Sequence, residues 1–172
     1  MYQSNHHRGE DMEFTFRRAT ADDAELLAQM RLEMRRERET AVCAISEAEF
    51  LRYNVDFFRT HLAEGAFISF LAYDGDEAAA CSGMSLQVHP PTYENPSGRS
   101  GYITNMFTRP KWRHRGLARM LVDRLVESAR DAGCAKLYLN ASPMGRPVYE
   151  KYGFRPVDGE MAFDIPQMRS LT

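Results

Sequence analysis

The segment GYITNMFTRPKWRHRGLARM, residues 101–120, combines a strand-like run, a basic turn and the first turns of a helix. Residues 101–108 are rich in strand-forming side chains, and the run ends before Pro110. The segment therefore predicts a strand, a turn and an amphipathic helix in direct succession. Beyond the turn, apolar residues recur at helical spacing up to the stop signal at Gly133: Leu117, Met120, Leu121, Leu125 and Val126.

The turn between this strand and this helix is strongly basic. Residues 108–120 carry five Lys and Arg and no acidic residue, although the whole chain has a formal net charge of -2. The helix would begin near Gly116, and backbone N–H groups at a helix N-terminus attract anions such as phosphate. A glycine there lets an anion approach the backbone. A solvated basic turn is the alternative, and the spacing fits neither a Walker loop nor a dinucleotide-binding loop.

The other elements predict a mixed α/β domain. Two capping boxes, Thr20 with Asp23 and Ser46 with Glu49, each mark a helix start. Asp74–Gly75 between two apolar runs is a strong hairpin signal. In chain order we expect a strand at 14–19, a helix from 21 to about 39, a helix from 46 to about 64, strands on both sides of residues 74–75, a strand at 135–140, a short helix beginning at Ser142–Pro143 and ending at Tyr152, and a last strand near 160–165.

Composition limits the class of protein. The chain has 172 residues, of which 44% are hydrophobic and 27% charged, which is typical of one soluble globular domain. A net charge near zero gives no general attraction to nucleic acid or anionic lipid. No apolar run is long enough to span a membrane, and the N-terminus lacks the apolar core of a signal peptide. We expect a cytoplasmic protein with a flexible extension at 1–11 and a single domain at 12–172.

The three cysteines do not suggest a metal or a disulfide framework. Cys43, Cys81 and Cys134 are odd in number, far apart and never part of a CxxC pair. We interpret them as small buried hydrophobic residues, and a redox or nucleophilic role is the alternative. No metal site is expected.

Two motifs resemble a known family. RHRGLA, residues 113–118, resembles the R/Q-x-x-G-x-G/A loop of the GNAT superfamily of acyl-CoA-dependent N-acyltransferases, in which this loop holds the pyrophosphate of coenzyme A. LYLNASPMGRPVYEKYGF, residues 137–154, is similar to the family's second signature, a strand ending in Asn followed by a short helix. The resemblance covers residues 14–165. It implies one mixed, mostly antiparallel sheet of about six to seven strands with about four helices, its fourth and fifth strands splayed around the pantetheine arm.

Position by position, the resemblance implies which residues contact the coenzyme. Backbone amides of residues 113–118 would bind the pyrophosphate, with the side chains of Arg113 and Arg115 nearby. The backbone of residues 106–108 would pair with the pantetheine arm, and an amide there would polarise the thioester carbonyl. Asn140 would contact pantetheine where the two strands diverge. The full implied set is Met106, Phe107, Thr108, Arg113, His114, Arg115, Gly116, Leu117, Ala118, Asn140, Arg146 and Tyr149.

The resemblance also suggests an acid. Tyr149 matches the tyrosine whose hydroxyl lies near the thioester sulfur in many members, which suits it to protonate the leaving thiolate as a general acid. It lies further from Asn140 than in commoner members, and a packed ring without chemistry is the alternative. Arg146 would reach a coenzyme phosphate or a substrate carboxylate, or be a plain surface arginine.

The base is not evident from the fourth strand. The family's usual position is not acidic here, since the run YITNM offers Tyr102, Thr104 and Asn105. We therefore expect a water-relayed or remote base, with Glu94 and His89 of the 89–99 loop as candidates. Solvated loop residues without a role are the alternative.

The resemblance implies an N-acetyltransferase that moves an acetyl group from acetyl-CoA, its co-substrate, to a primary amine of a small molecule by direct attack in a ternary complex. Two alternatives stay open: an acetyltransferase acting on a protein or peptide, and an acyl-CoA-binding regulatory module without turnover. A nucleic-acid-binding domain would need aromatic side chains interleaved with the basic ones, and Trp112 alone is too little. No nucleic-acid or membrane partner is expected, and the family admits a homodimer.

Overall fold

A computed structural model describes residues 13–38 and 44–157 of the chain. The described residues divide after Asn140 into two compact units. The first unit contains a sheet of five strands in the order β1-β2-β3-β4-β5, with every strand beside its neighbour in sequence. The strands are β1 (Thr15–Arg18), β2 (Phe67–Asp74), β3 (Glu77–Val88), β4 (Arg99–Thr108) and β5 (Lys136–Leu139).

The sheet is mixed and mostly antiparallel, as predicted. The first three pairings are antiparallel, and β5 joins β4 in parallel. The hairpin between β2 and β3 turns at Gly75–Asp76, where Gly75 has a φ of 58° that suits a tight two-residue turn. The predicted count of six to seven strands is wrong for the described residues, which contain five strands. The strand expected near 160–165 lies outside the described residues.

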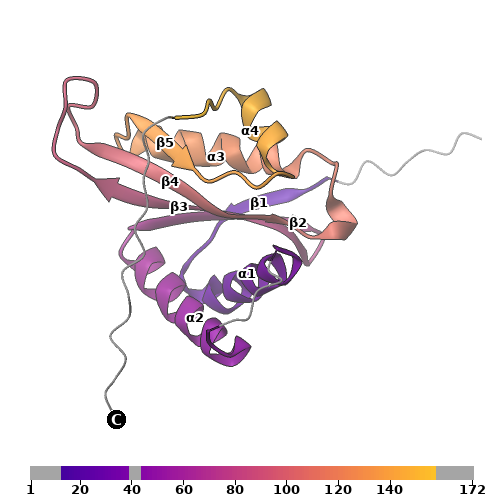
Figure 1. Ribbon diagram of the computed structural model, residues 1–172. Coiled ribbons are helices and arrows are strands. Elements are labelled where there is room, and N and C mark those ends of the chain that lie inside the picture. The colour runs from indigo at the N-terminus through magenta and orange to yellow at the C-terminus, as the bar shows by residue number, and fades with distance from the viewer. Residues whose placement is uncertain (1–12, 39–43, 158–172) are drawn as a thin grey trace, which may run out of the picture. The chain divides into compact units, whose positions relative to one another are not determined.

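Helices cover both faces of this sheet (Figure 1). On one face lie α1 (Ala24–Arg38) and α2 (Glu47–Ala63), and on the other lies α3 (Leu117–Asp131). Each helix turns an apolar stripe to the sheet, because burying that stripe is the main favourable term in folding. Three elements that the sequence predicted, the helix from Ser46, the helix from Gly116 and the hairpin, are therefore confirmed.

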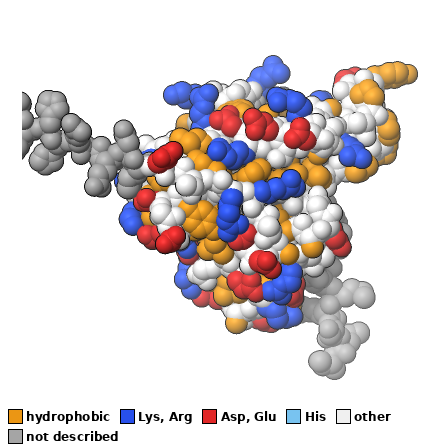
Figure 2. Space-filling view, turned by 180° about the vertical axis from the view of Figure 1, so that it is seen from behind, with side chains coloured by type: hydrophobic (Ala, Val, Ile, Leu, Met, Phe, Trp, Pro, Cys, Tyr) orange, Lys and Arg blue, Asp and Glu red, His pale blue; other side chains and the backbone are white. Residues whose placement is uncertain are grey.

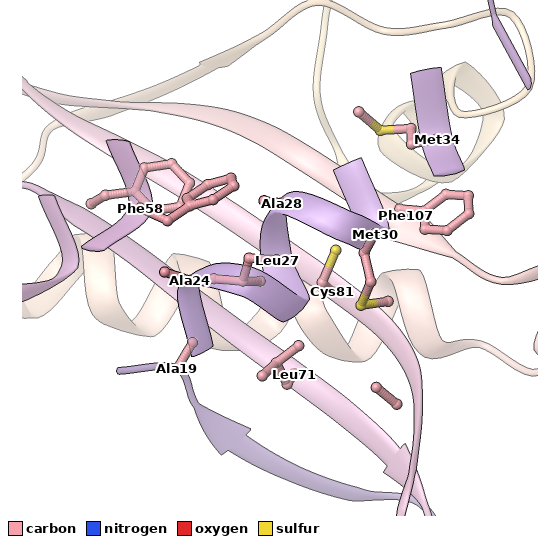
Figure 3. Close-up of a cluster of buried hydrophobic side chains, with 12 residues drawn as sticks. Ala19, Ala24, Leu27, Ala28, Met30, Met34, Phe58, Leu71, Cys81 and Phe107 are labelled. Carbon is pink, nitrogen blue, oxygen red and sulfur yellow. The ribbon is translucent and has the colours of Figure 1, made fainter. Parts of the chain in front are cut away.

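Two buried clusters form the core. In Figure 3, Leu27 and Met30 of α1 lie beside Cys81 of β3 and Phe107 of β4. On the opposite face, Trp112 joins residues of α3, β2 and β3 in a second cluster. From Arg99 to Thr104, β4 pairs residue by residue with β3, and the register shifts between Thr104 and Phe107.

The capping box at the start of α2 closes as the sequence predicts. The Ser46 hydroxyl accepts a hydrogen bond from the Glu49 backbone N–H at 3.3 Å, and the Ser46 N–H donates to the Glu49 carboxylate at 2.9 Å. Each bond engages a backbone N–H at the start of the helix that has no acceptor within the helix itself.

We expect Ser46→Ala to lower the free energy of unfolding by about 1 kcal/mol, because the cap is lost while the exposed site leaves no cavity. Urea denaturation followed by circular dichroism measures the change. Ser46→Asp is the matched variant, since aspartate also caps a helix and is expected to stay within about 0.5 kcal/mol of wild type. Equal losses in the two variants would show that the cap contributes nothing.

The second unit contains α4 (Arg146–Tyr152). The sequence placed its start at Ser142–Pro143, which is wrong. The Ser142 carbonyl accepts hydrogen bonds from the N–H groups of Gly145 and Arg146, so residues 143–145 form a turn before the helix begins. Proline near a helix start is favoured because its missing N–H is not needed there, and Pro147 rather than Pro143 fills that position.

Among residues 13–38 and 44–157, no helix combines the length and the apolar character that a membrane crossing requires.

Candidate functional site

The second half of β4 has an open edge. β5 pairs with β4 only from Ser100 to Ile103, so within the described chain no strand covers the far edge of β4 from Thr104 to Thr108. The Arg109 N–H donates to the Ala79 carbonyl of β3, so the two-residue alternation of a strand turns the backbone N–H of Thr108 toward the open edge, while the Thr108 carbonyl accepts from Arg113. An extended ligand can pair with such an edge as an added strand would.

A rigid turn follows the open edge. A short 3-10 helix, Pro110–Trp112, leads from β4 toward α3. The Trp112 ring is 1% exposed, and its Nε1–H donates to the Asp74 carboxylate at 2.8 Å. The buried Trp112 ring therefore anchors this loop in the core.

The turn ends in two residues with left-handed backbone. His114 has φ of 63° and Gly116 has φ of 80°. The N-cap residue of α3 is Gly116, which has no side chain to cap the helix, and the first N–H groups of a helix lack intrahelical acceptors. A Cβ atom added at Gly116 would have only Met120 Cε, at 3.6 Å, as a neighbour, so the space in front of this backbone is open. Left-handed residues beside a helix N-terminus form an anion-binding concavity.

The Arg113 side chain ties this loop to two other elements. Its Nε donates to the Thr108 carbonyl at 3.0 Å, and its guanidinium pairs with Glu37 of α1 at 2.5 Å. In the structure this side chain joins β4, the loop and α1, and its place near a bound pyrophosphate, which the resemblance implies, stays a prediction. Arg115 is exposed, and the backbone role of residues 113–118 stays a prediction.

A second ion pair joins α1 to the same turn. Arg109 binds Glu33 through two nitrogen–oxygen contacts of 2.8 and 2.9 Å, and it also donates to the Ala78 carbonyl at 2.8 Å. The hydrogen bond from Arg109 lowers the pKa of Glu33 below its ordinary value of 4.5, although partial burial opposes the change. Glu33 is therefore an ionised structural partner and is poorly suited to take a proton from a substrate near neutral pH.

The Glu33–Arg109 pair predicts a pH dependence of stability. Because the pKa of Glu33 is lower in the folded state, the ion pair stabilises the folded protein at pH values above the ordinary pKa of a glutamate. This stabilisation is lost as the pH falls through the folded-state pKa of Glu33. We expect Glu33→Gln to have a lower free energy of unfolding than wild type at pH 7. The difference between the two proteins is expected to become smaller as the pH falls below about 4. Chemical denaturation at pH 7, 5 and 3 measures the difference, and a difference independent of pH would contradict the prediction.

The sequence missed a buried polar cluster in the middle of β4. Asn105 is 2% exposed, has φ of 52°, and accepts a hydrogen bond from Arg31 of α1 at 3.4 Å on its side-chain oxygen. Its backbone carbonyl accepts from the Cys81 thiol at 3.3 Å. An asparagine in a strand-forming run gave the only signal, since Asn is uncommon inside strands and tolerates a left-handed backbone.

The two candidate bases lie in the loop before β4. His89 and Glu94 are both exposed, and the His89 N–H donates to the Gly98 carbonyl at 2.8 Å. The strand from Arg99 to Asn105 spans roughly 20 Å at about 3.4 Å per residue, so this loop joins the far end of β4 from the open edge. The roles of His89 and Glu94 stay predictions, and each would need a water chain or another position of the loop to reach that edge.

The remaining candidates lie at and beyond the end of β5. Asn140 follows β5 directly and is exposed. In α4, the half-buried Tyr149 packs edge-on against Phe154, with ring centroids 5.8 Å apart. Arg146 is exposed and pairs with Glu150 at 3.2 Å, which is the ordinary contact of a surface arginine. The catalytic role of Tyr149 stays a prediction.

The open edge of β4 and the start of α3 offer two kinds of backbone group to a ligand. A strand edge can pair with an extended amide-bearing arm, and an N-terminus with left-handed backbone can bind a pyrophosphate. The two features are adjacent, because the turn at residues 109–116 connects them. Coenzyme A has both parts in that order. The described residues hold no group of three or more His, Cys, Asp and Glu side chains arranged for a metal ion.

Comparison with known proteins agrees with this geometry. The family model for the acetyltransferase (GNAT) family matches residues 21–154. A predicted acetyltransferase from Clostridium acetobutylicum, whose crystal structure contains acetyl-CoA, is 35% identical, with a TM-score of 0.79 over 88% of this chain and 96% of that one.

Two curated relatives are similar over shorter stretches. A glucosamine 6-phosphate N-acetyltransferase from Trypanosoma brucei brucei is 35% identical over 47% of this chain, and a thialysine N-epsilon-acetyltransferase from Caenorhabditis elegans is 31% identical over 69% of it. The matches span 54% and 66% of the lengths of these two relatives.

Proposed function

The chain belongs to the acetyltransferase (GNAT) family, and from this premise we propose that it transfers an acetyl group from acetyl-CoA to a primary amine of a small molecule. The amine attacks the thioester directly, in a ternary complex. The observation that carries the proposal is the open edge of β4 running into the uncapped N-terminus of α3. That pair of features offers an acyl-CoA one place for its arm and one for its pyrophosphate.

The residues of the chain have distinct tasks in this proposal. Bound acetyl-CoA supplies the acyl group as a reactive thioester. The backbone N–H groups of residues 113–118 bind the pyrophosphate, and the buried Trp112 together with Arg113 holds that loop in place. The backbone of residues 106–108 orients the arm, and a fixed N–H there stabilises the negative charge that develops on the carbonyl oxygen.

Proton transfer needs an acid and a base. The Tyr149 hydroxyl holds the proton for the sulfur that leaves, as the resemblance implies. The amine must lose a proton, and we keep His89 and Glu94, acting through water, as the candidate bases. Two carboxylates of α1, Glu33 and Glu37, form ion pairs with Arg109 and Arg113, so we do not assign either of them as the base.

Small-molecule amines are the proposed acceptors. The two curated relatives are named for glucosamine 6-phosphate and thialysine, which are both small amines. The face shown in Figure 2 carries acidic and basic side chains intermixed. The free thiols of Cys81 and Cys134 agree with a reducing compartment, and we propose the cytoplasm.

The experiment that tests the function has two stages. Calorimetric titration of the protein with acetyl-CoA is expected to show one-to-one binding, and an amine panel including glucosamine 6-phosphate and thialysine then identifies turnover by the free coenzyme A released. Absence of binding by the folded protein would refute the proposal. Binding without turnover of any amine would favour a regulatory acyl-CoA-binding module, an alternative supported by the absence of an acidic residue in β4.

A further inference from the structure

The strand that would hold the acyl group contains a bulge. In the ladder between β3 and β4, Thr104 pairs with Gly83 and Phe107 pairs with Cys81, which leaves Asn105 and Met106 opposite the single residue Ser82. A bulge of this kind re-aims the backbone and often lies beside an active site. It lies just beyond Ile103, the last residue of β4 that pairs with β5. The irregular peptide between Asn105 and Met106 therefore belongs to the open edge.

The direction of this peptide follows from one contact. The Asn105 carbonyl accepts a hydrogen bond from the Cys81 thiol at 3.3 Å, so this carbonyl points toward β3. The C=O and N–H of a planar trans peptide point in opposite directions. The N–H of Met106 therefore points away from the Cys81 thiol. This N–H is thus a backbone donor in the part of β4 that is proposed to hold the acyl group.

The peptide between Asn105 and Met106 follows a residue with a strained backbone, since Asn105 has φ of 52°. A non-glycine residue with positive φ is uncommon, and such strain persists only where its surroundings hold it. Both ends of the Asn105 side-chain amide are engaged: Oδ1 accepts from Arg31 at 3.4 Å, and Nδ2 donates to the Cys81 sulfur at 3.7 Å. Asn105 and Cys81 thus contact each other twice, once through the backbone carbonyl and once through the side chain.

We propose that Arg31, Asn105 and Cys81 are positioning residues that fix the Asn105–Met106 peptide, so that the Met106 N–H stabilises the developing oxyanion of the acyl group. This inference rests on the proposed acetyltransferase function. Catalytic hydrogen-bond donors are effective because they are already oriented before charge develops. Arg31 lies on α1, so its contact also links that helix to the backbone proposed to polarise the acyl group.

Cys81 is suited to this role rather than to a nucleophilic one. Its side chain is fully buried, and burial raises the pKa of the thiol to about 12. The group therefore stays protonated at neutral pH, remains a hydrogen-bond donor to Asn105, and is unreactive as a thiolate.

Asn105→Gly is the most direct test, because glycine adopts positive φ without strain while removing both side-chain contacts. We expect kcat to fall about tenfold to a hundredfold. This is a smaller fall than removal of an entire oxyanion donor causes, because the Met106 N–H itself is still present. The dissociation constant for coenzyme A, which lacks the acyl group, is expected to stay within about twofold, since the pyrophosphate loop is untouched. Asn105→Asp is the second variant, since it keeps the acceptor for Arg31 and loses the donor to Cys81.

Two further variants test the partners. Arg31→Gln is compared with Arg36→Gln, which removes an exposed arginine of the same helix that pairs with Glu47. Cys81→Ala, which removes the thiol donor, is compared with Cys81→Ser, which restores a donor. We expect kcat to fall in Arg31→Gln and in Cys81→Ala and to be unchanged in Arg36→Gln. In Cys81→Ser, kcat is expected to lie between those of Cys81→Ala and wild type.

A readout on the ligand-free protein separates positioning from catalysis. Amide hydrogen exchange of a peptide covering residues 104–108 is expected to accelerate in Asn105→Gly and Arg31→Gln and to remain unchanged in Arg36→Gln, with the rest of the sheet protected as in wild type. Wild-type rate and wild-type exchange in Asn105→Gly would overturn the inference. Failure of the wild-type protein to bind coenzyme A would instead refute the proposed function.

Discussion

Gly116→Glu is expected to abolish detectable binding of acetyl-CoA, with affinity at least about 100-fold weaker, because the new carboxylate would occupy the proposed pyrophosphate site at the start of α3. A like charge facing a pyrophosphate costs several kcal/mol, and each 1.4 kcal/mol is about tenfold in affinity. The side chain has room, since only Met120 Cε lies within 4 Å of the added Cβ. Folding is expected to survive, because an acidic group at a helix N-terminus is itself favourable.

The controls separate charge from backbone strain. Gly133 has φ of 73° and follows the other end of α3, so Gly133→Glu places the same side chain on a similarly left-handed backbone. Gly116→Ala adds the strain without the charge. Calorimetric titration of the four proteins with acetyl-CoA is expected to show near-normal binding by Gly133→Glu and a modest loss in Gly116→Ala. Normal binding of acetyl-CoA by Gly116→Glu would show that this loop is not the coenzyme site.

The second large effect is expected from Tyr149→Phe, which should lower kcat by about 100-fold, within the range that general acid catalysis contributes. Phenylalanine keeps the ring and its edge-on contact with Phe154, so stability is expected to change little. The dissociation constant for acetyl-CoA is also expected to be unchanged, because the proposed task of the hydroxyl is to protonate the departing sulfur and not to bind the ground state.

Tyr152→Phe is the matched control, since Tyr152 lies one turn further along α4 and its ring also packs on Phe154, at 6.0 Å. Steady-state rates with a saturating amine compare the two variants. Equal rates in Tyr149→Phe and wild type would assign Tyr149 to packing alone, and the leaving sulfur would then need another proton donor.

The sequence predicted elements whose signals are local. Ser46 and Glu49 form a capping box within four residues, Gly116 and Gly133 bracket α3, and the hairpin turn needs only adjacent residues. Each of these signals depends on backbone chemistry that operates over a few positions. The basic turn belonged to the same class, because a helix start after a strand can be recognised without knowing what packs against it.

Contacts between distant residues could not be predicted in the same way. Arg113 pairs with Glu37, 76 positions away, and nothing in the sequence around Arg113 distinguishes that partner from a bound phosphate. The bulge at Asn105 likewise depends on Arg31, 74 positions away, and on Cys81 in another strand. The start of α4 was misplaced because Ser142 offers a good capping signal while its carbonyl closes a turn first.

The order of the strands has a consequence for how the protein is made. Because the sheet follows the order of the sequence, each strand pairs with the one that precedes it along the chain. A chain emerging from the ribosome at about 5–20 residues per second can thus build its sheet through β4 before α3 and β5 appear. The loop proposed to hold the coenzyme is completed only after that sheet exists. A cell short of acetyl-CoA is therefore expected to make a correctly paired sheet, because the ligand has no place to bind until the strands have already assembled.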